Sequence, residues 1–403
     1  MNTLIAKQGI LRFAIFMLFY SCFVNAQAQR LTPQQYIEDL EYLKNELPKK
    51  HKNLFAKISE KEFNIRVKNI EDKSNDLTDE SFEIELYKLI KEIGDEHTSI
   101  VPVYKTIYPL NFGFFKEGIF ITNTDSLHAH LLYKKLGGIN GTKTEGIIKN
   151  FKKIAQDDNQ SYFKNRFQYF IKCPGILKGL SITSSDSMAS VILDNKKYLI
   201  TSMPIDNFSP KNTSKLLRFS NYDNYWYQLI NDGNVLYFNY QACSEQEGKP
   251  FDIFNKELFN FIESKKPQKI VIDLRNNGGG NSAILEPFLN KLKDNYLNKK
   301  GSLYVLIGKN TFSSAVMNAV ELKRNYNSIL VGGEPTGGNV NHYGEVRGFQ
   351  LPNSKITVGY STQYWENWKG YKGPLLPDIK IEYSIYNFRN NIDEAIEYAK
   401  KAK

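Results

Sequence analysis

The sequence predicts an α/β protein with a mainly parallel sheet in its C-terminal half. Beyond about residue 220, short apolar runs such as NVLYFNY, KIVIDLR and SLYVLIG alternate with amphipathic segments of helical period. This alternation is typical of strands that are joined by crossover helices, and such strands pair in parallel. The chain of 403 residues exceeds the usual size of one domain, so we expect two or three domains.

Residues 1–28 have the pattern of a secretory signal peptide. Two basic residues precede an apolar run over residues 13–24, and two alanines follow it with the spacing of a cleavage site. The run has about a dozen residues, whereas a membrane-spanning helix needs roughly 20. We therefore expect a secreted or periplasmic protein without a membrane span. Lipid attachment at Cys22 is less favoured, because Phe19 stands where a small aliphatic residue is usual.

Residues 30–100 predict a small helical domain. The stretch LTPQQ offers an N-cap threonine, a proline in the first turn and a glutamine three residues after the cap. A second helix is expected over residues 60–73. A third should begin after Thr78 and end at Gly94, because threonine caps helix starts and glycine commonly ends helices.

Residues 105–205 change to short alternating runs that are broken by turns, such as GIFITNT and ASVILDNKKYLITSM. A β-rich module with at least one helix is therefore expected. Within it, LGGINGTKTEGIIK resembles the part of a PDZ domain in which a strand and an Ile-Asn-Gly turn lead to a helix. The resemblance implies a reduced PDZ-like module, because the usual Gly-Leu-Gly-Phe loop is not evident. The sequence leaves open whether Cys173 and Cys243 pair.

Residues 220–400 contain the alternating strands and helices and should form the α/β core. Helices are expected over FDIFNKELFNFIES, AILEPFLNKLK and SAVMNAVELK. In open parallel sheets, ligands bind at the carboxyl ends of the strands. Functional residues should therefore follow directly after KIVIDLR and SLYVLIG.

A glycine-rich stretch, NNGGGNS over residues 276–282, follows the first of these strands. Consecutive glycines can turn the chain sharply and expose backbone N–H groups to a ligand, as an oxyanion hole requires. An ordinary turn between strand and helix would explain the same residues. The stretch lacks the spaced glycines and the lysine of a phosphate-binding loop.

Ser314 follows the second strand, at the expected start of a helix. It could cap that helix, and Ser313 or Thr311 could fill the same role. It could also act as a nucleophile, because the free N–H groups and the positive dipole of a helix N-terminus stabilise a developing oxyanion. A serine nucleophile needs a base to accept its proton.

His97, in GDEHTSI, is the candidate base because it follows a helix end among acidic and hydroxyl residues. A histidine base is commonly held in one tautomer by a carboxylate. The glycine-rich stretch GEPTGGNVNHYGEVRGFQ supplies Glu334 and Glu345 for that role. Three other histidines lie in polar or turn-like settings and are expected at the surface: His51, His128 and His130.

The net charge of +10 comes from lysines that are spread through the chain. A nucleic-acid binder usually concentrates basic and aromatic residues in a block, which the sequence lacks. Bound zinc is also disfavoured, because the sequence has no close cluster of histidines and cysteines. We therefore expect neither nucleic acid nor a metal ion as a partner.

Three stretches together resemble, in order and spacing, the core of the C-terminal processing (tail-specific) serine peptidase family: KIVIDLRNNGGGNS, TFSSAVMNAVELK and VGGEPTGGNVNHYGEVRGFQLPNSKITV. The resemblance covers about residues 220–385 and implies a Clp/crotonase-like fold for the core. It also implies that Ser314 is the nucleophile. The oxyanion hole would then be formed by Ala315 and by Gly278 or Gly279.

One position departs from the pattern of that family. Tail-specific members activate serine with a lysine in a Gly-Glu-x-Thr-x-Gly-Lys segment, where this chain has Asn339. The sequence is therefore more similar to the branch related to the tricorn protease core, in which an upstream histidine serves as base with a downstream glutamate. That branch implies His97 as the base and Glu345 as its partner, with Glu334 as the alternative.

The resemblance implies a secreted serine endopeptidase that cleaves a peptide or protein substrate and needs no cofactor. The main alternative is a non-catalytic binding protein for lipid or peptide on the same scaffold, as in interphotoreceptor retinoid-binding protein. A crotonase-like acyl-CoA enzyme is a third alternative, which secretion disfavours because CoA would be out of reach.

Overall fold

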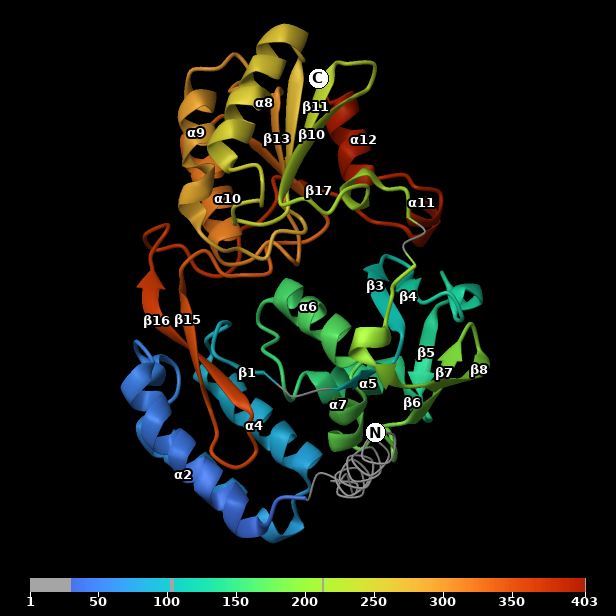
Figure 1. The fold of residues 1–403 in the computed structure, drawn as a ribbon, viewed down its shortest axis with the longest axis vertical. Coiled ribbons are helices and arrows are strands. Elements are labelled where there is room, and N and C mark those ends of the chain that lie inside the picture. Colours follow the sequence, from blue (N-terminus) through green and yellow to red (C-terminus); the bar gives the residue numbers. More distant parts are fainter. Residues whose placement is uncertain (1–29, 102–104, 212–213, 403) are drawn as a thin grey trace, which may run out of the picture.

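The computed structural model describes residues 30–101, 105–211 and 214–402. The expected signal peptide and Cys22 lie outside these residues. None of the helices in the described part of the chain combines the length and the apolar character that are needed to cross a membrane. Figure 1 shows three groups of elements: helices near the N-terminus, a β-rich group beside them, and a larger sheet that is covered by helices.

Three helices form the first group, as predicted: α2 (Pro33–Lys50), α3 (Glu60–Glu71) and α4 (Asp79–Ile93). The hydroxyl of Thr32 accepts a hydrogen bond from Gln35 N, and the Gln35 side chain accepts one from Thr32 N. This reciprocal cap fixes the start of α2. Gly94 ends α4 with a φ of 70°, which glycine adopts without steric cost.

The β-rich group combines small antiparallel sheets with helices. Strands β3 (Leu110–Phe115) and β4 (Gly118–Thr124) pair with each other. A second sheet has the order β6-β5-β7-β8. Its strands and the helices around it are β5 (Leu136–Ile139), β6 (Thr142–Lys143), β7 (Met188–Leu193), β8 (Lys196–Thr201), α5 (Thr144–Phe151), α6 (Gln160–Phe170) and α7 (Pro174–Gly179). Two short strands pair where the group begins and ends: β2 (Thr106–Ile107) and β9 (Met203–Pro204).

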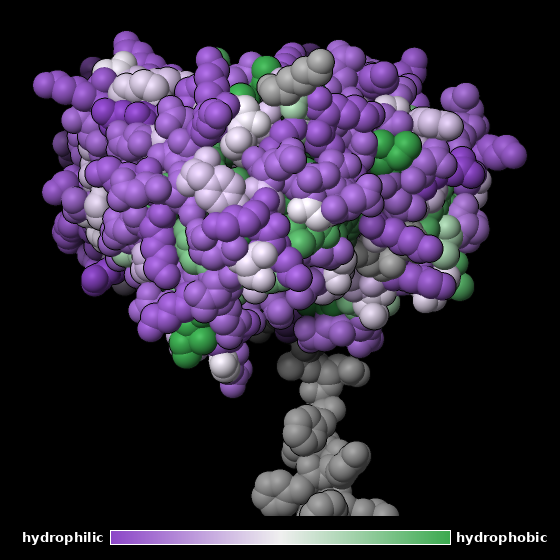
Figure 2. Space-filling model, turned by 90° about the horizontal axis from the view of Figure 1, so that it is seen from above, coloured by the Kyte–Doolittle hydropathy of each residue, from purple (hydrophilic) through white to green (hydrophobic). Residues whose placement is uncertain are grey.

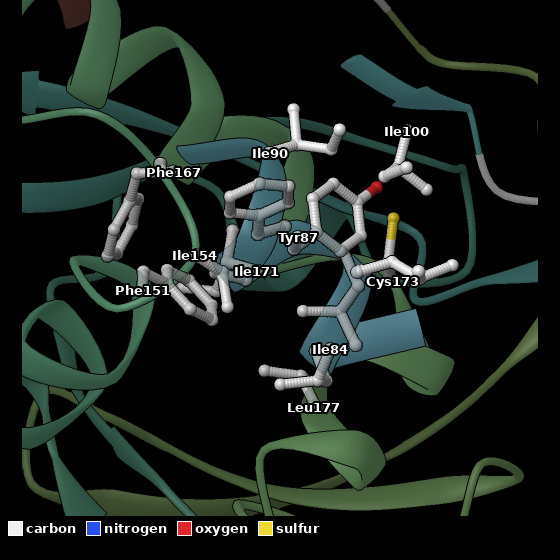
Figure 3. Packing of buried hydrophobic residues seen from close by; sticks show 14 of the residues in the cluster. Ile84, Tyr87, Ile90, Ile100, Phe151, Ile154, Phe167, Ile171, Cys173 and Leu177 are labelled. Carbon is white, nitrogen blue, oxygen red and sulfur yellow. The ribbon is translucent and has the colours of Figure 1, made fainter. Parts of the chain in front are cut away.

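One hydrophobic core joins the N-terminal helices to the β-rich group. Figure 3 shows Tyr87 and Ile90 of α4 beside side chains from α5, α6 and α7. The rings of Tyr87 and Phe170 meet edge to face at 5.4 Å between centroids. Burial of each large apolar side chain stabilises the fold by roughly 1.5–3 kcal/mol. The shared core therefore holds these two groups against each other.

The larger sheet has six strands in the order β10-β11-β12-β13-β14-β17. β10 pairs antiparallel with β11 and all later pairs are parallel, which confirms the predicted mainly parallel sheet. Helices α8, α9 and α10 cover one face and α12 covers the other (Figure 1). The bounds are β10 (Tyr225–Ile230), β11 (Val235–Tyr240), α8 (Phe251–Lys265), β12 (Lys269–Asp273), α9 (Glu286–Lys293), β13 (Leu303–Leu306), α10 (Ser314–Asn325), β14 (Ile329–Gly332), β17 (Ile379–Lys380), α11 (Ile385–Arg389) and α12 (Glu394–Lys401).

A long hairpin, β15 (His342–Gln350) and β16 (Thr357–Trp365), leaves the larger sheet and reaches the N-terminal helices (Figure 1). There β16 pairs antiparallel with β1 (Ser99–Val101). Val358 and Tyr360 of β16 join the core beneath the N-terminal helices. The hairpin thus brings the segment that follows α4 close to residues at the start of β15.

The surface is mainly hydrophilic. Figure 2 shows one face on which polar and charged residues dominate and apolar residues appear singly or in small groups. This agrees with the spread of lysines along the sequence. On this face the functional site is therefore to be sought in cavities, where side chains converge, and not on an extended apolar patch.

Candidate active site

Three of the predicted residues line one cavity of about 580 Å³. Ser314 reaches it from the start of α10, His97 from the segment after α4, and Glu345 from β15. Apolar side chains complete part of the wall: Met317, Val346 and Trp365. The fold therefore brings together side chains from distant parts of the sequence, at the carboxyl ends of the parallel strands as expected.

The hydroxyl of Ser314 does not cap α10. Ser314 is the first residue of that helix and is 7% exposed, and its Oγ donates a hydrogen bond to Gly280 O at 2.5 Å. Ser313 holds the N-cap position with a φ of 53°, yet its side chain makes no capping bond within the described chain. Thr311 donates to Leu274 O instead. Capping therefore explains none of the three hydroxyl groups, and that of Ser314 faces the glycine-rich stretch.

The glycine loop, residues 276–282, lies against the start of α10. Gly279 has a φ of 106°, and a Cβ atom there would lie 2.7 Å from Ser313 Cβ. Gly280 has a φ of 131°, and a Cβ atom there would lie 2.2 Å from Cys243 O. Because no side chain fits at either position, Gly279 is required for the close approach of the loop to the helix, and Gly280 for its close approach to Cys243.

The predicted oxyanion-hole donors lie in this loop and at the helix start, but two of them already have acceptors. The Gly279 N–H donates to Asn277 Oδ1 at 2.9 Å, and the Ala315 N–H donates to Phe312 O at 3.1 Å. Gly278 lines a neighbouring cavity. An oxyanion would therefore have to displace these acceptors or use other N–H groups of the glycine loop.

The ring of His97 lies in an aromatic stack. Its centroid is 4.4 Å from that of Phe312 and 5.1 Å from that of His342. His97 is 8% exposed, and neither ring nitrogen has a hydrogen-bond partner among the described residues. Burial lowers the pKa of His97 to about 4, and the neighbouring His342 adds to this effect. The imidazole is therefore neutral near pH 7, as a proton acceptor must be.

Asp95 holds the backbone at His97. Its buried carboxylate accepts four hydrogen bonds, from the His97 N–H, His51 Nε2 and the hydroxyls of Thr98 and Ser361. Burial opposes ionisation, but the bonds from His51, Ser361 and Thr98 hold the pKa of Asp95 well below its usual range. The prediction that His51 lies at the surface is wrong, because its ring is buried against this carboxylate.

The two candidate carboxylates occupy different places. Glu345 lines the cavity of His97, with an exposed side chain and a φ of 56°. Glu334 lines another cavity, where it pairs with Lys164 at 2.8 Å and with Lys309 at 3.6 Å. Burial raises the pKa of Glu334, but the two lysines outweigh burial and leave the value below its usual range. Of the two glutamates, Glu345 therefore shares the cavity with the candidate base.

Asn339 stands where tail-specific peptidases have their lysine, and its backbone makes two bonds at the site. Its N–H donates to Glu96 Oε2, and its carbonyl oxygen accepts from His342 Nδ1, both at 2.9 Å. Asn159 Nδ2 also donates to Glu96, at 3.4 Å. Burial raises the pKa of Glu96 to about 8, against the effect of these hydrogen bonds. The position therefore holds Glu96 and His342 in place through its main chain.

Sequence reasoning missed two residues that shape the site. His342 is 6% exposed and stacks on His97, and the signal for it was its position in the same glycine-rich stretch as Glu345. Arg275 follows β12 and donates to Asp273 and Asp393, so it anchors the entry to the glycine loop. Of the remaining histidines, His130 is exposed as predicted and His128 is half-buried beside Asp125.

Two further cavities adjoin the first. One of about 530 Å³ shares His97 and Val346 with it. The next, of about 430 Å³, shares Asn276, Lys309 and Asn310 with the second and lies between the β-rich group and the larger sheet. Adjoining cavities of this kind suit an extended chain, which can place successive side chains in successive hollows.

Cys173 and Cys243 are both buried, and neither forms a disulfide in the described structure. Burial raises the pKa of Cys243 to about 11 and that of Cys173 to about 12. Both thiols therefore stay protonated near neutral pH and are poor nucleophiles. Within residues 30–101, 105–211 and 214–402, no three His, Cys, Asp or Glu side chains are grouped so that they could hold a metal ion.

Comparison with solved structures shows a similar fold over most of the chain. The structure of mature CPAF complexed with lactacystin is 13% identical, with 92% of this chain and 97% of that chain covered and a TM-score of 0.64. Mature CPAF is 13% identical, with 92% of this chain and 96% of that chain covered and a TM-score of 0.63. A mutant of CPAF is 11% identical, with 92% and 96% covered and a TM-score of 0.65. No protein-family model matches the sequence, and no match is found among curated proteins.

Proposed function

We propose that this protein is a serine peptidase that hydrolyses peptide bonds in a peptide or protein substrate. The observation that carries the proposal is that Ser314 and His97, which are far apart in the sequence, line one cavity. The Ser314 hydroxyl caps no helix, and the His97 ring nitrogens are unpartnered among the described residues. The resemblance of the glycine and serine segments to processing peptidases supports the same function.

The same proposal covers the domains, the branch of the peptidase family and the location of the protein. Residues 220–400 form a Clp/crotonase-like core, residues 105–205 a reduced PDZ-like module, and residues 30–100 the helical domain that carries the base. The His97 base places the chain in the tricorn-core-like branch, because Asn339 cannot act as the lysine would. Residues 1–28 direct the protein to the periplasm or out of the cell.

The proposed reaction uses the chemistry of a serine and a histidine. Ser314 Oγ bonds to the carbonyl carbon while its proton passes to His97, and the carbonyl π electrons move onto oxygen. The tetrahedral intermediate collapses as the C–N bond breaks, and the imidazolium returns the proton to the leaving amine. Water then attacks the acyl-enzyme by the same steps and releases Ser314. The N–H groups of the glycine loop and of Ala315 bind the oxyanion, for which those of Gly279 and Ala315 must first release Asn277 and Phe312.

Two side chains must move before this reaction can begin. The Ser314 hydroxyl has to release Gly280 O and turn toward the cavity. Glu345, which we propose as the third member, has to turn inward from its exposed position to reach the His97 ring. Catalytic hydrogen bonds are often absent before substrate binds, so such movement is compatible with a Ser/His/Glu mechanism.

A non-catalytic binding protein for lipid or peptide is the second candidate function. The 430 Å³ cavity favours it, because four phenylalanines line that cavity away from Ser314: Phe114, Phe115, Phe219 and Phe388. Aromatic side chains are common in the walls of ligand sites, and charged side chains such as Lys164 and Glu334 line the same cavity. Such a protein would have no use for an activated serine.

A serine-directed fluorophosphonate separates the two functions. We expect the folded wild-type protein to gain one phosphonate, located on Ser314 by mass spectrometry of its peptides, because a base-activated hydroxyl displaces fluoride. Heat-unfolded protein and the Ser314→Ala variant should remain unlabelled. If the folded protein stays unlabelled while it binds a fluorescent fatty acid, the binding function replaces the peptidase.

In the pH profile of peptide hydrolysis, the decline of kcat/KM on the acid side should lie near pH 4. A base must be neutral to take a proton, and burial lowers the pKa of His97 from 6.5 to about 4. We expect kcat/KM for peptide hydrolysis to fall about tenfold per pH unit below that value. Between pH 6.5 and pH 4 the unfolded chain binds more protons at His97 than the folded protein does. The free energy of unfolding therefore also decreases as the pH falls through this window. Circular dichroism must show that the protein is folded at each pH. An acid limb near pH 6.5 would contradict a buried base.

A further inference from the structure

We propose that His342 is a positioning residue for His97: stacking of the His97 ring against Phe312 and His342 orients that ring before Glu345 turns inward to reach it. The inference rests on the proposed function and deepens it, since it assigns a role within the same site. It also explains how the base can be held although Glu345 is exposed.

The ring of His97 is buried and stacks on two other rings. Phe312 stacks on it at 4.4 Å with an interplanar angle of 28°, and His342 at 5.1 Å with an angle of 13°. Both rings lie nearly parallel to the imidazole and pack against it. Rotation of the imidazole out of its plane would drive it into one of them. The plane of the ring is therefore fixed without a hydrogen bond to either nitrogen.

Phe312 couples this plane to the nucleophile. It lies two residues before Ser314, its N–H donates to Asn277 O at 3.0 Å, and its carbonyl accepts from Ala315 N. A Cβ atom at Gly338 would lie 3.0 Å from the Phe312 ring, so that side of the ring is closed as well. The face of an aromatic ring also attracts a cation, which favours the imidazolium that forms during reaction.

His342 is held by its own hydrogen bond. Because a carbonyl oxygen can only accept, the bond to Asn339 O at 2.9 Å places the proton of His342 on Nδ1. Asn339 is fixed in turn by its bond to Glu96. His97 lines two of the adjoining cavities, whereas His342 lines neither the cavity of Ser314 nor the next one. His342 therefore stands behind the base and is not itself the base.

Three substitutions of His342 distinguish the contribution of its ring from the contribution of its hydrogen bond. His342→Ala removes both, His342→Phe keeps a flat ring, and His342→Gln keeps an N–H donor without a ring. We expect His342→Ala to lower kcat for peptide hydrolysis roughly 10- to 100-fold, because small misplacement of a reacting group has effects of that size. KM should stay nearly unchanged, since substrate does not touch this residue. His342→Phe should recover most of the lost kcat, and His342→Gln should not.

His130→Ala is the matched control, because it makes the same change at an exposed histidine that lines none of the three cavities. Its kcat should remain at the wild-type level. A folded His342→Ala protein with wild-type kcat would overturn the inference, as would recovery by glutamine and not by phenylalanine. The comparison of His342→Phe with His342→Gln tests the inference even if His342→Ala does not fold. In either case the fluorophosphonate would still label wild-type Ser314, so the proposed function would stand. A wild-type protein that is neither labelled nor active would overturn both.

Discussion

Replacing Ser314 by alanine is expected to lower kcat for peptide hydrolysis on the order of 10⁴- to 10⁶-fold, as is typical when the nucleophile of a serine peptidase is removed. The variant should stay folded. It loses one hydrogen bond, from Oγ to Gly280 O, which stabilises by about 1 kcal/mol. A fluorogenic peptide assay measures the activity, and thermal denaturation followed by circular dichroism measures the small loss of stability.

Ser313→Ala provides the matched control. It makes the same chemical change one residue earlier, at a side chain that makes no capping bond in the described structure. Most of the activity should remain. If Ser313→Ala inactivates the enzyme and Ser314→Ala does not, the nucleophile has been assigned one residue too late. Equal and full activity of both variants would remove the serine mechanism altogether.

The parts of the fold that sequence predicts are those that local pattern determines. The reciprocal cap at Thr32, the helix end at Gly94 and the alternation of the larger sheet each depend on residues that are near neighbours in the chain. Ser314 could be placed at a helix start for the same reason. The glycine loop could be placed after its strand, because the strand and the glycines adjoin each other.

The parts that sequence does not predict depend on contacts between distant residues. His51 has the polar neighbours of a surface residue in the sequence, yet its ring is buried. The ring bonds the carboxylate of Asp95, which also accepts hydrogen bonds from Thr98 and Ser361. The pairing of β1 with β16 has no local signal either. His342 enters the site through that same hairpin, so its role appears only when the hairpin has been placed.

The Asp95 carboxylate ties the segment of His97, the proposed base, to the hairpin that follows much later in the chain. It accepts from the backbone of His97 on one side and from Ser361 of β16 on the other, at 2.9 and 2.6 Å. A buried carboxylate that loses its partners is strongly destabilising. The bond to β16 therefore resists any movement of the base segment away from the hairpin.

Replacing His97 by alanine should be the most informative change at this site. We expect kcat to fall on the order of 10⁴-fold or more, with KM little changed, because the general base acts mainly in the transition state. Folding should survive, since neither ring nitrogen bonds a partner in the described structure and Asp95 holds the backbone of the residue. His130→Ala is the control, because it removes an exposed histidine that does not line the cavity.

Chemical rescue distinguishes loss of the base from collapse of the site. The alanine variant leaves a flat space beside Phe312 and His342, whose rings both stack on the imidazole that the substitution removes. Added imidazole should enter that space and restore part of kcat in proportion to its neutral fraction, because only the neutral ring accepts a proton. Rescue in His97→Ala but not in Ser314→Ala would assign the lost function to proton transfer. Full activity of His97→Ala without imidazole would leave Ser314 without its base and would favour the binding function instead.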